Sequence, residues 1–456
     1  MPRLDGHNSV NVAKGEQGRH NRVIELRREE RHTKSDVIRV ALLTGGADRP
    51  YAYGLANALA SKGVTLDLIA NDDLMCPELM SDPGVNFLNF RGNQSSEAGS
   101  LAKALRVMSY YVKLIRYARK AEPTIFHILW NNKFELFDRT LLMLYYKLLG
   151  KRSVLTLHNI NSRRRDSGDT LINRLTLWIQ YRLAEHIFAH TEKMKQELMR
   201  DFGKSESRIT VIPFGINNAV PDTRLTCVEA KERLKLGKDK KAILFFGHIA
   251  PYKGLEYLIA AFRLLNHEQN DYQLIIAGRP KNCKGYWAAI QSEMENEILK
   301  GRILVRDRFV PDAETETYFK AADVLVLPYR HIYQSGVLFL GYSFGLPVLA
   351  ADVGSLKEEV VEGRTGFVFR PEDATDLRRT IEHYFESDLY KELGERREEI
   401  RDYVRKRNSW DTVGERTMDV YFKLAHSTSA EGGFQGASRM SSAYEQPDRS
   451  FDRRSQ

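Results

Sequence analysis

The sequence predicts an α/β protein made of two doubly wound domains in tandem that face a central cleft. Short apolar runs typical of buried strands alternate with longer amphipathic stretches typical of helices, and this alternation predicts parallel sheets covered by helices on both faces. The chain has 456 residues, which is too many for one hydrophobic core of ordinary size. A glycine-containing turn follows the first predicted strand of each half, at residues 45–46 and at residue 247.

The first domain is predicted over residues 37–220, behind a polar arm at 1–36 that we expect to be disordered. Its strands are expected at residues 37–43, 64–70, 85–90, 125–129, 153–157, 186–189 and 209–212. Its helices are expected at residues 51–62, 101–120, 139–149, 171–183 and 192–202. The opening strand, helix and strand form one β-α-β unit, which indicates a parallel sheet.

A linker is predicted over residues 221–240, and the second domain over residues 241–395. Strands of the second domain are expected at residues 242–246, 273–277, 303–305, 324–327, 348–350 and 366–369. Helices are expected at residues 255–265, 337–344, 374–386, 389–403 and 410–425. The helices of segment 396–426 are expected to pack back toward the first domain, and the polar tail at 427–456 is expected to be disordered.

The net charge of +9 is modest, because 60 acidic residues are interspersed along the chain. No nucleic-acid recognition motif is present, so a mildly basic enzyme is favoured over a nucleic-acid-binding module. Three scattered cysteines fit neither a disulfide framework nor a zinc site. No uncharged apolar run reaches the roughly twenty residues that span a bilayer, and the N-terminus lacks the apolar segment of a signal peptide. We therefore expect a cytoplasmic location.

The predicted helix at 101–120 interleaves apolar residues with six Lys or Arg side chains. Such a helix fits the surface of an anionic membrane, so peripheral contact with the cytoplasmic face of a membrane is one alternative. A helix of this kind more often packs one face on a core and exposes the other, and we favour that interpretation.

The stretch 323–366 holds the strongest functional signal. A strand buried on both faces leads into a polar loop and then into a helix that Gly345 ends. The loop lies at the carboxyl end of its strand, where open parallel sheets bind ligands. A helix leaves its first N–H groups without partners, so Gly336, Val337 and Leu338 are expected to seat a phosphate.

Lys253 provides a second contact for the same phosphate. It follows the predicted strand at 242–246 and lies beside glycines just before a helix, where an ammonium group can bind a phosphate. A plain surface lysine is the alternative for Lys253 on its own. The helix start on a neighbouring strand makes the phosphate interpretation the stronger one, and we take the phosphate to be the diphosphate of an activated sugar.

Further candidates follow strands of the first domain. His158 follows its strand directly and is expected to face the cleft, although a lone histidine is more often structural. Arg163, in an arginine run, could contact a charged acceptor or lie in a solvated loop. Gly45 and Gly46 form half of a dinucleotide fingerprint without its third glycine, so a plain turn is favoured over a cofactor site.

Several enzyme classes find no support in the sequence. It contains no HExxH, paired CxxC, GxSxG or Walker lysine motif, which argues against zincins, serine hydrolases and P-loop NTPases. No DxD pair follows a predicted strand, so a metal-dependent transferase of the other main fold is not indicated. We accordingly predict no metal site.

Taken in order, several segments resemble the GT-B retaining glycosyltransferases of family 4. They are FFGHIAPYKGLEYLIAAF, LIIAGRP, ADVLVLPY and FGLPVLAADVGSLKEEVVEGRTGFVF in the second half, and HTEKMKQELMRDFG with RITVIPFGIN in the first. The resemblance runs from about residue 38 to residue 421. It implies two Rossmann-like domains, a UDP- or GDP-linked sugar bound mainly by the second, and a glycan or lipid-linked acceptor held by the first. It also implies transfer of a hexose with retention of configuration, without metal ion or organic cofactor, in polysaccharide or glycoconjugate biosynthesis.

The resemblance also implies a set of site residues. His158 and Lys253 match the catalytic positions, namely a histidine beside the transferred sugar and a phosphate-binding lysine. The implied donor-binding residues are Gly247, His248, Lys253, Arg279, Val310, Tyr333, Gln334, Ser335, Gly336, Val337, Leu338 and Glu358. The implied acceptor-side residues are Gly45, Gly46, Arg49 and Arg163.

Two positions depart from the family pattern. His248 stands where relatives usually carry an arginine, so that charge is missing or is supplied by Arg279. Tyr333 and Gly341 stand where relatives often carry two glutamates, and Gln334 could take over contacts with the sugar hydroxyls. Two alternative functions follow. One is a nucleotide-sugar epimerase of the same fold, for which these positions offer no acid/base carboxylate. The other is a catalytically silent relative that binds a partner glycosyltransferase.

Overall fold

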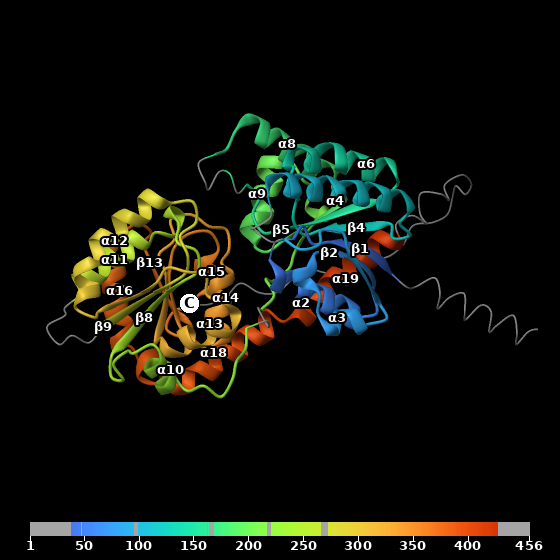
Figure 1. The fold of residues 1–456 in the computed structure, drawn as a ribbon. Coiled ribbons are helices and arrows are strands. Elements are labelled where there is room, and N and C mark those ends of the chain that lie inside the picture. Colours follow the sequence, from blue (N-terminus) through green and yellow to red (C-terminus); the bar gives the residue numbers. More distant parts are fainter. Residues whose placement is uncertain are drawn as a thin grey trace, which may run out of the picture.

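Two parallel sheets, each covered by helices, form the protein and confirm the predicted α/β architecture. The structure is a computed structural model that describes residues 38–46, 48–94, 99–161, 163, 168–216, 220–265 and 272–426. The predicted arm at 1–36 and tail at 427–456 lie outside the described residues. Figure 1 shows the two sheets beside each other, with the last described helix returning from the second to the first.

The first sheet has seven strands in the order β3-β2-β1-β4-β5-β6-β7. These strands are β1 (Arg39–Leu43), β2 (Thr65–Ala70), β3 (Val85–Asn89), β4 (Ile125–Ile128), β5 (Arg152–Leu157), β6 (His186–Ala189) and β7 (Ile209–Val211). The main helices around it are α2 (Arg49–Ser61), α3 (Pro77–Ser81), α4 (Ser100–Lys120), α5 (Glu135–Phe137), the π-helical turn η2 (Asp138–Leu142), α6 (Met143–Leu148), α8 (Leu171–Leu183) and α9 (Glu192–Phe202).

The second sheet has six strands in the order β10-β9-β8-β11-β12-β13. These strands are β8 (Lys241–Phe246), β9 (Tyr272–Ala277), β10 (Ile303–Arg306), β11 (Val324–Leu327), β12 (Val348–Ala351) and β13 (Gly366–Phe369). Its helices are α10 (Cys227–Arg233), α11 (Leu255–Leu264), α12 (Lys284–Leu299), α13 (Asp312–Ala321), α14 (Gly336–Ser343), α15 (Leu356–Glu359) and α16 (Ala374–Glu386).

Five of these helices, α3, α5, α12, α13 and α15, were not predicted from the sequence. Helix α12 buries only Trp287, Ile290, Met294 and Glu297, which is a narrow stripe for a sixteen-residue helix. Its N-cap residue, Cys283, makes no capping hydrogen bond from its side chain. Because neither the apolar pattern nor a start signal is strong, the helix is hard to recognise in the sequence.

The strand order places a topological switch point in each sheet. In the first sheet β1 lies between β2 and β4, so the chain leaves β1 toward one edge and later returns to its other side. In the second sheet β8 lies in the same way between β9 and β11. Loops after the two strands at a switch point diverge and leave a crevice at their carboxyl ends, which is where open α/β sheets bind ligands.

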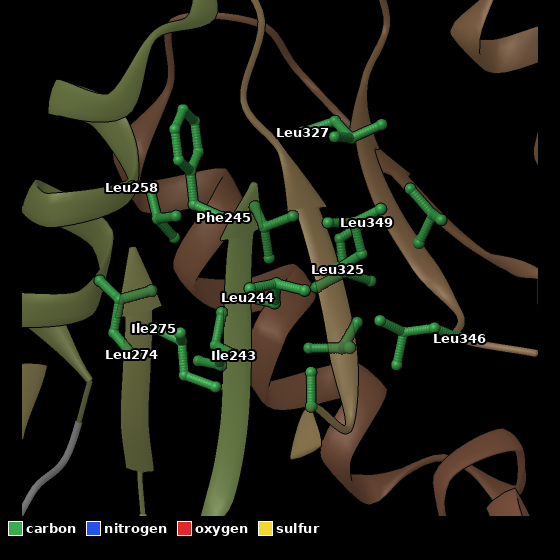
Figure 2. Close-up of a cluster of buried hydrophobic side chains, with 14 of the residues drawn as sticks. Ile243, Leu244, Phe245, Leu258, Leu274, Ile275, Leu325, Leu327, Leu346 and Leu349 are labelled. Carbon is green, nitrogen blue, oxygen red and sulfur yellow. The ribbon is translucent and has the colours of Figure 1, made fainter. Parts of the chain in front are cut away.

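The central strands of the second sheet are buried on both faces. Ile243, Leu244 and Phe245 are consecutive residues of β8 and all have no exposed surface. Because consecutive side chains of a strand point to opposite faces, helices must cover both sides of the sheet. Figure 2 shows Leu258 of α11 packing beside β8 and Leu325 of β11 in the same cluster. This packed sheet is the rigid base from which the loops of the candidate site project.

The C-terminal helices differ in part from the prediction. The helix expected at 389–403 is two helices, α17 (Asp388–Lys391) and α18 (Leu393–Arg407). Helix α18 packs against α14 of the second sheet rather than toward the first domain. Only α19 (Trp410–His426) reaches the first sheet, where it packs against α2 and β4.

Trp410 fixes the point at which the chain crosses back to the first sheet. Its indole Nε1 donates a hydrogen bond of 2.7 Å to the carbonyl oxygen of Ile216. The indole also fills the space where a Cβ on Gly54 or Gly215 would lie, since such an atom would be only 2.0 or 2.4 Å from the ring. Two glycines therefore make room for one tryptophan.

Candidate functional site

Gly247, Lys253 and Val337 meet at the switch point of the second sheet. A Cβ placed on Gly247 would lie 2.9 Å from Nζ of Lys253 and 3.4 Å from Cγ2 of Val337. Lys253 is only 6% exposed, and its Nζ lies 5.0 Å from the ring centroid of Tyr329. Lys253 and the start of α14, which the sequence predicts as two separate phosphate contacts, thus lie next to each other in the structure.

Close backbone approaches produce this arrangement. Gly247, at the end of β8, has φ of +102°, a conformation that side chains disfavour. A Cβ on Gly278, after β9, would lie 1.8 Å from the carbonyl oxygen of Gly247. A Cβ on Gly254 would lie 2.0 Å from the carbonyl oxygen of Pro328, after β11. Glycine at these positions therefore lets the turn that carries Lys253 lie directly against β11.

The start of α14 differs from the prediction at one residue. Leu338 is fully buried, and its N–H donates to the carbonyl oxygen of Ser335 at 3.1 Å, so it is not the free donor that was expected. Ser335 makes no side-chain cap to the helix; its Oγ donates to the hydroxyl oxygen of Tyr329 at 3.5 Å. The first-turn N–H groups of Gly336 and Val337 are the remaining candidates for the phosphate.

A pocket of about 230 Å³ opens beside the Lys253 turn. It is lined by Val220, Phe246, Gly247, His248, Ala277, Gly278, Arg279, Phe309, Val310, Asp312, Thr315 and Leu340. The Arg279 guanidinium lies 5.9 Å from the ring centroid of Phe309. Partial burial, followed by the positive charges of Lys253, Lys281 and Arg279, lowers the pKa of His248 below its usual value. Apolar walls with cations at the mouth suit a ligand that has a flat apolar part and an anionic part.

The two positions at which relatives often carry glutamates, Tyr333 and Gly341, do not line the pocket beside Lys253. A Cβ on Gly341 would lie 2.8 Å from Cδ2 of Leu325, so this position faces the sheet and not the pocket. Leu340, one residue earlier, lines the pocket instead. The Tyr333 hydroxyl donates to Oε1 of Glu197 on α9 at 2.8 Å, and therefore ties the second domain to the first. Tyr333 does not line the pocket of about 230 Å³ beside Lys253.

His158 lies in an aromatic cluster beside the switch point of the first sheet. Its ring stacks on Trp130 with centroids 4.2 Å apart, and the rings of Tyr51 and His190 lie 4.6 and 5.0 Å away. Burial, and then the nearby His190 and His127, lower the pKa of His158 well below its usual range, so the ring is neutral near pH 7. Its Nε2 is buried and has no hydrogen-bond partner among the described residues. Buried polar atoms are normally paired, so this atom fits a contact with substrate.

Phe214 connects His158 to the start of α14. Its ring centroid lies 6.1 Å from that of His158 and 5.7 Å from that of Phe339 on α14. A Cβ on Gly336 would lie 3.6 Å from Cε1 of Phe214. Just before the helix, both amide atoms of Gln334 are buried without a hydrogen-bond partner among the described residues. The structure therefore brings His158 and the start of α14 against the same aromatic ring.

The turn after β1 lies against the histidine cluster. Gly45 has φ of +63°, and a Cβ on it would lie 2.5 Å from the carbonyl oxygen of Trp130. Trp130, Glu135 and His158 line a pocket of about 180 Å³ on this side of the molecule. Nη2 of Arg163 forms an ion pair of 3.1 Å with Glu135. Gly45 and Arg163 thus each contact a residue that lines this pocket, and their acceptor-side role stays a prediction.

Three other predicted site residues lie further out. Gly46 is exposed, and a Cβ on it would lie 2.8 Å from Nη1 of Arg91. Arg49 is exposed at the start of α2, where its charge acts on Tyr53. Glu358 is exposed on the short helix α15 and lines neither of the two pockets described above.

Five further residues of the site were not predicted, namely Trp130, His190, Tyr51, Phe214 and Tyr329. His190 directly follows β6 and Trp130 lies two residues after β4, so the strand-end argument that singled out His158 applies to them as well. Tyr329 lies two residues after β11 in the same way. Phe214 and Tyr51 carry no local signal, since only the packing of distant segments places them here.

No group of three His, Cys, Asp or Glu side chains is placed to hold a metal ion in the part of the chain that the structure describes. Among the same residues, no helix combines the length and the apolar character that crossing a membrane requires.

Comparison with known proteins gives matches over both halves of the chain. The family described as Glycosyl transferases group 1 matches residues 228–407, and the family described as Glycosyltransferase Family 4 matches residues 44–220. D-inositol 3-phosphate glycosyltransferase from Streptomyces avermitilis is 27% identical over 248 residues, 52% of this chain and 52% of the relative. The enzyme of the same name from Streptomyces scabiei is 27% identical over 255 residues, 54% of this chain and 55% of the relative. The chain therefore spans about half the length of these curated relatives.

Solved structures share the fold over most of the chain. Sucrose-phosphate synthase from Thermosynechococcus elongatus superposes with a TM-score of 0.66 and 18% identity, covering 85% of this chain and 99% of that one. HepE from Anabaena, in complex with UDP and glucose, superposes with a TM-score of 0.65 and 17% identity, covering 85% of this chain and all of that one. At this identity the likeness concerns the fold.

Proposed function

The chain belongs to the group 1 glycosyl transferases, and from that premise we propose that it transfers a hexose from a UDP- or GDP-sugar to a glycan or lipid-linked acceptor. The observation that carries the proposal is the meeting of Lys253, Gly247 and the start of α14 at one switch point. Complexes of HepE with UDP and glucose support a nucleotide sugar as donor. We place the reaction in polysaccharide or glycoconjugate biosynthesis.

The proposed chemistry requires stabilisation of a leaving diphosphate. Negative charge develops on the diphosphate as its bond to the sugar breaks, and the transition state gains most from donors already fixed in position. The Lys253 ammonium and the N–H groups of Gly336 and Val337 are such donors. Since these groups supply the positive charge, the proposal includes neither a metal ion nor an organic cofactor.

Retention of configuration is part of the proposal. The incoming hydroxyl would approach the sugar on the face that the diphosphate leaves, and an oxygen of the diphosphate would accept its proton. Nε2 of His158 and the side-chain amide of Gln334, which have no hydrogen-bond partner among the described residues, would hold the sugar hydroxyls. A neutral His158 donates or accepts a hydrogen bond without adding charge beside the oxocarbenium-like sugar.

The nucleotide would occupy the pocket beside Lys253. Its base fits the apolar walls formed by Val310 and Leu340, and its phosphates fit the cationic mouth near Arg279.

A donor panel tests the proposal directly. The full chain is incubated with UDP-glucose, UDP-GlcNAc and GDP-mannose, and release of UDP or GDP is measured with and without oligosaccharide or polyprenyl-phosphate sugar acceptors. We expect slow hydrolysis of one donor, faster release with an acceptor, and retention of the anomeric configuration by NMR. The Lys300→Ala variant, which removes an exposed lysine of the same domain, is the matched control for Lys253→Ala.

The same panel separates the alternative functions. Conversion of the sugar to its epimer without transfer would assign the chain to the epimerases. Tight nucleotide binding without turnover of any donor or acceptor would support the catalytically silent relative. Absence of both turnover and nucleotide binding would overturn the proposal.

A further inference from the structure

Helices α4, η2, α6 and α8 form one layer on the first sheet. Helix α8 packs against η2 and α6. The Tyr145 hydroxyl of α6 donates to the carbonyl oxygen of Ile115 on α4 at 3.2 Å, and the Tyr111 hydroxyl of α4 donates to Oδ1 of Asp138 on η2 at 3.0 Å. Figure 1 shows α4, α6 and α8 side by side along the same side of the sheet. We call the outward side of this layer the outer face.

The outer face of α4 is apolar although nothing in the described chain covers it. Leu101, Leu105, Met108 and Val112 are between 42% and 74% exposed. Their spacing of three and four residues places them on one side of the helix. The side that packs on the core is a different one, which includes the fully buried Leu114. As expected, α4 packs one face on the core. Its exposed face, however, carries a stripe of apolar side chains and is not purely polar.

The same pattern recurs on the neighbouring helices. The residues with this spacing are Leu141, Leu144 and Leu148 on η2 and α6, and Leu171, Leu175 and Trp178 on α8, and they are between 44% and 82% exposed. Three neighbouring helices thus each carry a stripe of large, exposed apolar side chains. Large exposed apolar surfaces mark sites of interaction, because folded proteins rarely leave them open to water.

The charge of the outer face limits the choice of partner. Helix α4 carries six Lys or Arg residues and no Asp or Glu. Lys113, Arg116 and Arg119 are exposed on it, beside the apolar stripe. Lys147 and Arg182 are exposed near the ends of α6 and α8. Two copies of such a face would repel each other, whereas an anionic surface would attract it.

A pocket joins the outer face to the site. Leu175 and Trp178 line a pocket of about 480 Å³ between α8 and α9. Its charged lining residues are Asp169, Arg174, Glu197 and Asp201, so this pocket is acidic although α4 beside it is basic. Glu197 accepts the hydrogen bond from Tyr333, which lies next to Gln334 of the site. An acceptor held at the outer face would therefore have its polar end close to the contact between Glu197 and Tyr333.

We propose that the outer face docks the protein on a membrane surface that contains anionic lipid, with the apolar stripes inserted among the acyl chains and the cations at the headgroups. Leu, Met and Trp side chains flanked by Lys and Arg are the composition of interfacial helices. The inference rests on the proposed function, which it deepens by assigning the acceptor to the lipid-linked class. The docking itself requires no turnover and is tested separately from it.

Vesicle binding by the full chain tests the inference. Sedimentation is measured with vesicles of phosphatidylcholine alone and with vesicles of equal parts phosphatidylcholine and phosphatidylglycerol. We expect binding to the anionic vesicles, weakened by salt, and little to the neutral ones. The triple variant Leu105→Glu, Leu148→Glu, Leu171→Glu should weaken binding by at least about tenfold per substitution. Replacing Arg116 or Arg119 by alanine should weaken it roughly fivefold each.

The matched control is Val228→Glu, Leu264→Glu, Leu299→Glu, since these side chains are also more than half exposed but lie on α10, at the end of α11 and on α12. It should bind anionic vesicles like the wild type. Donor hydrolysis and thermal unfolding of the outer-face variant should match the wild type and establish that it is folded. Equal binding by the outer-face and control variants would overturn the inference. So would absence of vesicle binding together with a dimer, or a complex with an acidic protein, that the outer-face variant loses. Vesicle binding without turnover of any donor would contradict the proposed function but support the proposed membrane docking.

Discussion

The indole of Trp130 lies parallel to the imidazole of His158, with ring centroids 4.2 Å apart and the two planes inclined by 1°. Trp130 follows β4, at the switch point of the first sheet, and Gly45 packs against its carbonyl oxygen from the turn after β1. The turn therefore positions the indole, and the indole sets the plane in which the unpaired Nε2 of His158 is held. Catalysis depends on such alignment, since a displacement of about 1 Å can cost on the order of a hundredfold in rate.

Removing the indole should therefore lower turnover without unfolding the protein. We expect Trp130→Ala to reduce kcat by about 10- to 100-fold, because the His158 ring can then rotate. Trp130→Phe, which keeps an aromatic face beside the imidazole, should recover most of that loss. Steady-state donor hydrolysis measures both variants. A Trp130→Ala protein that is folded and has wild-type kcat would show that the stacking has no role in positioning.

Filling the space beside Lys253 should weaken nucleotide binding. A Cβ on Gly247 would lie 2.9 Å from Nζ of Lys253, so Gly247→Ala should displace the ammonium and weaken binding of UDP or GDP by tenfold or more, about 1.4 kcal/mol. Gly301→Ala is the control, since Gly301 also has a positive φ, +69°, but has nothing within 4 Å of a new Cβ. Both variants should lose about 1–2 kcal/mol of stability through backbone strain. Equal nucleotide affinity in the two variants would contradict the account.

Two glycine-to-alanine changes should shift stability in opposite directions. A Cβ on Gly54 would lie 2.0 Å from the Trp410 ring, so Gly54→Ala must displace the indole and should cost roughly 2–4 kcal/mol, near the range for loss of a buried aromatic contact. Gly394, in α18, has nothing within 4 Å, so Gly394→Ala should stabilise the helix by about 0.5–1 kcal/mol. Urea unfolding provides both values. A neutral Gly54→Ala would show that α19 does not depend on this contact.

Stability should fall as the pH drops below about 6.5. His127 is fully buried, its Nε2 and Oγ1 of Thr156 are hydrogen-bonded at 2.7 Å, and its other ring nitrogen is hydrogen-bonded with the Tyr421 hydroxyl. Burial lowers the pKa of His127 to about 3. Between about pH 6.5 and pH 3 the unfolded chain therefore binds a proton that the folded chain does not, so the free energy of unfolding decreases by about 1.4 kcal/mol per pH unit from this residue.

At about pH 5 this amounts to about 2 kcal/mol for His127 alone. His127→Gln, whose amide can pair with both hydroxyls but does not titrate, should show a shallower loss over the same range. Chemical unfolding near pH 7 and near pH 5 compares the two proteins. Parallel pH dependences in the wild type and the variant would refute the assignment.

Much of the fold could be predicted because most helices and strands show a strong local pattern of apolar residues. The doubly buried strand β11 and the helices α8, α9 and α16 were predicted with the observed boundaries, since their apolar periodicity coincides with clear start and end signals. Helices α12 and α13 lacked those signals. The break at Glu392 between α17 and α18 has no such local signal either.

Only those site residues could be predicted that lie just after a single strand. Lys253, the start of α14 and His158 each follow a strand, and that placement is visible in the sequence. The contacts that relate them, such as Phe214 between His158 and Gly336, come from segments far apart in the chain. Likewise the sequence could not show that Leu340 rather than Gly341 faces the pocket, because a shift of one residue turns a helical side chain by about 100°.

The most direct test of the central claim is calorimetric titration of UDP and GDP into the wild type, Lys253→Ala and Lys300→Ala. The account places the diphosphate on the Lys253 ammonium, so loss of a charged hydrogen bond worth about 1.5–3 kcal/mol should weaken nucleotide binding by roughly 10- to 100-fold. Lys300→Ala, which changes an exposed lysine outside the site, should bind like the wild type. Unchanged affinity in a folded Lys253→Ala protein would contradict the placement of the donor at this switch point.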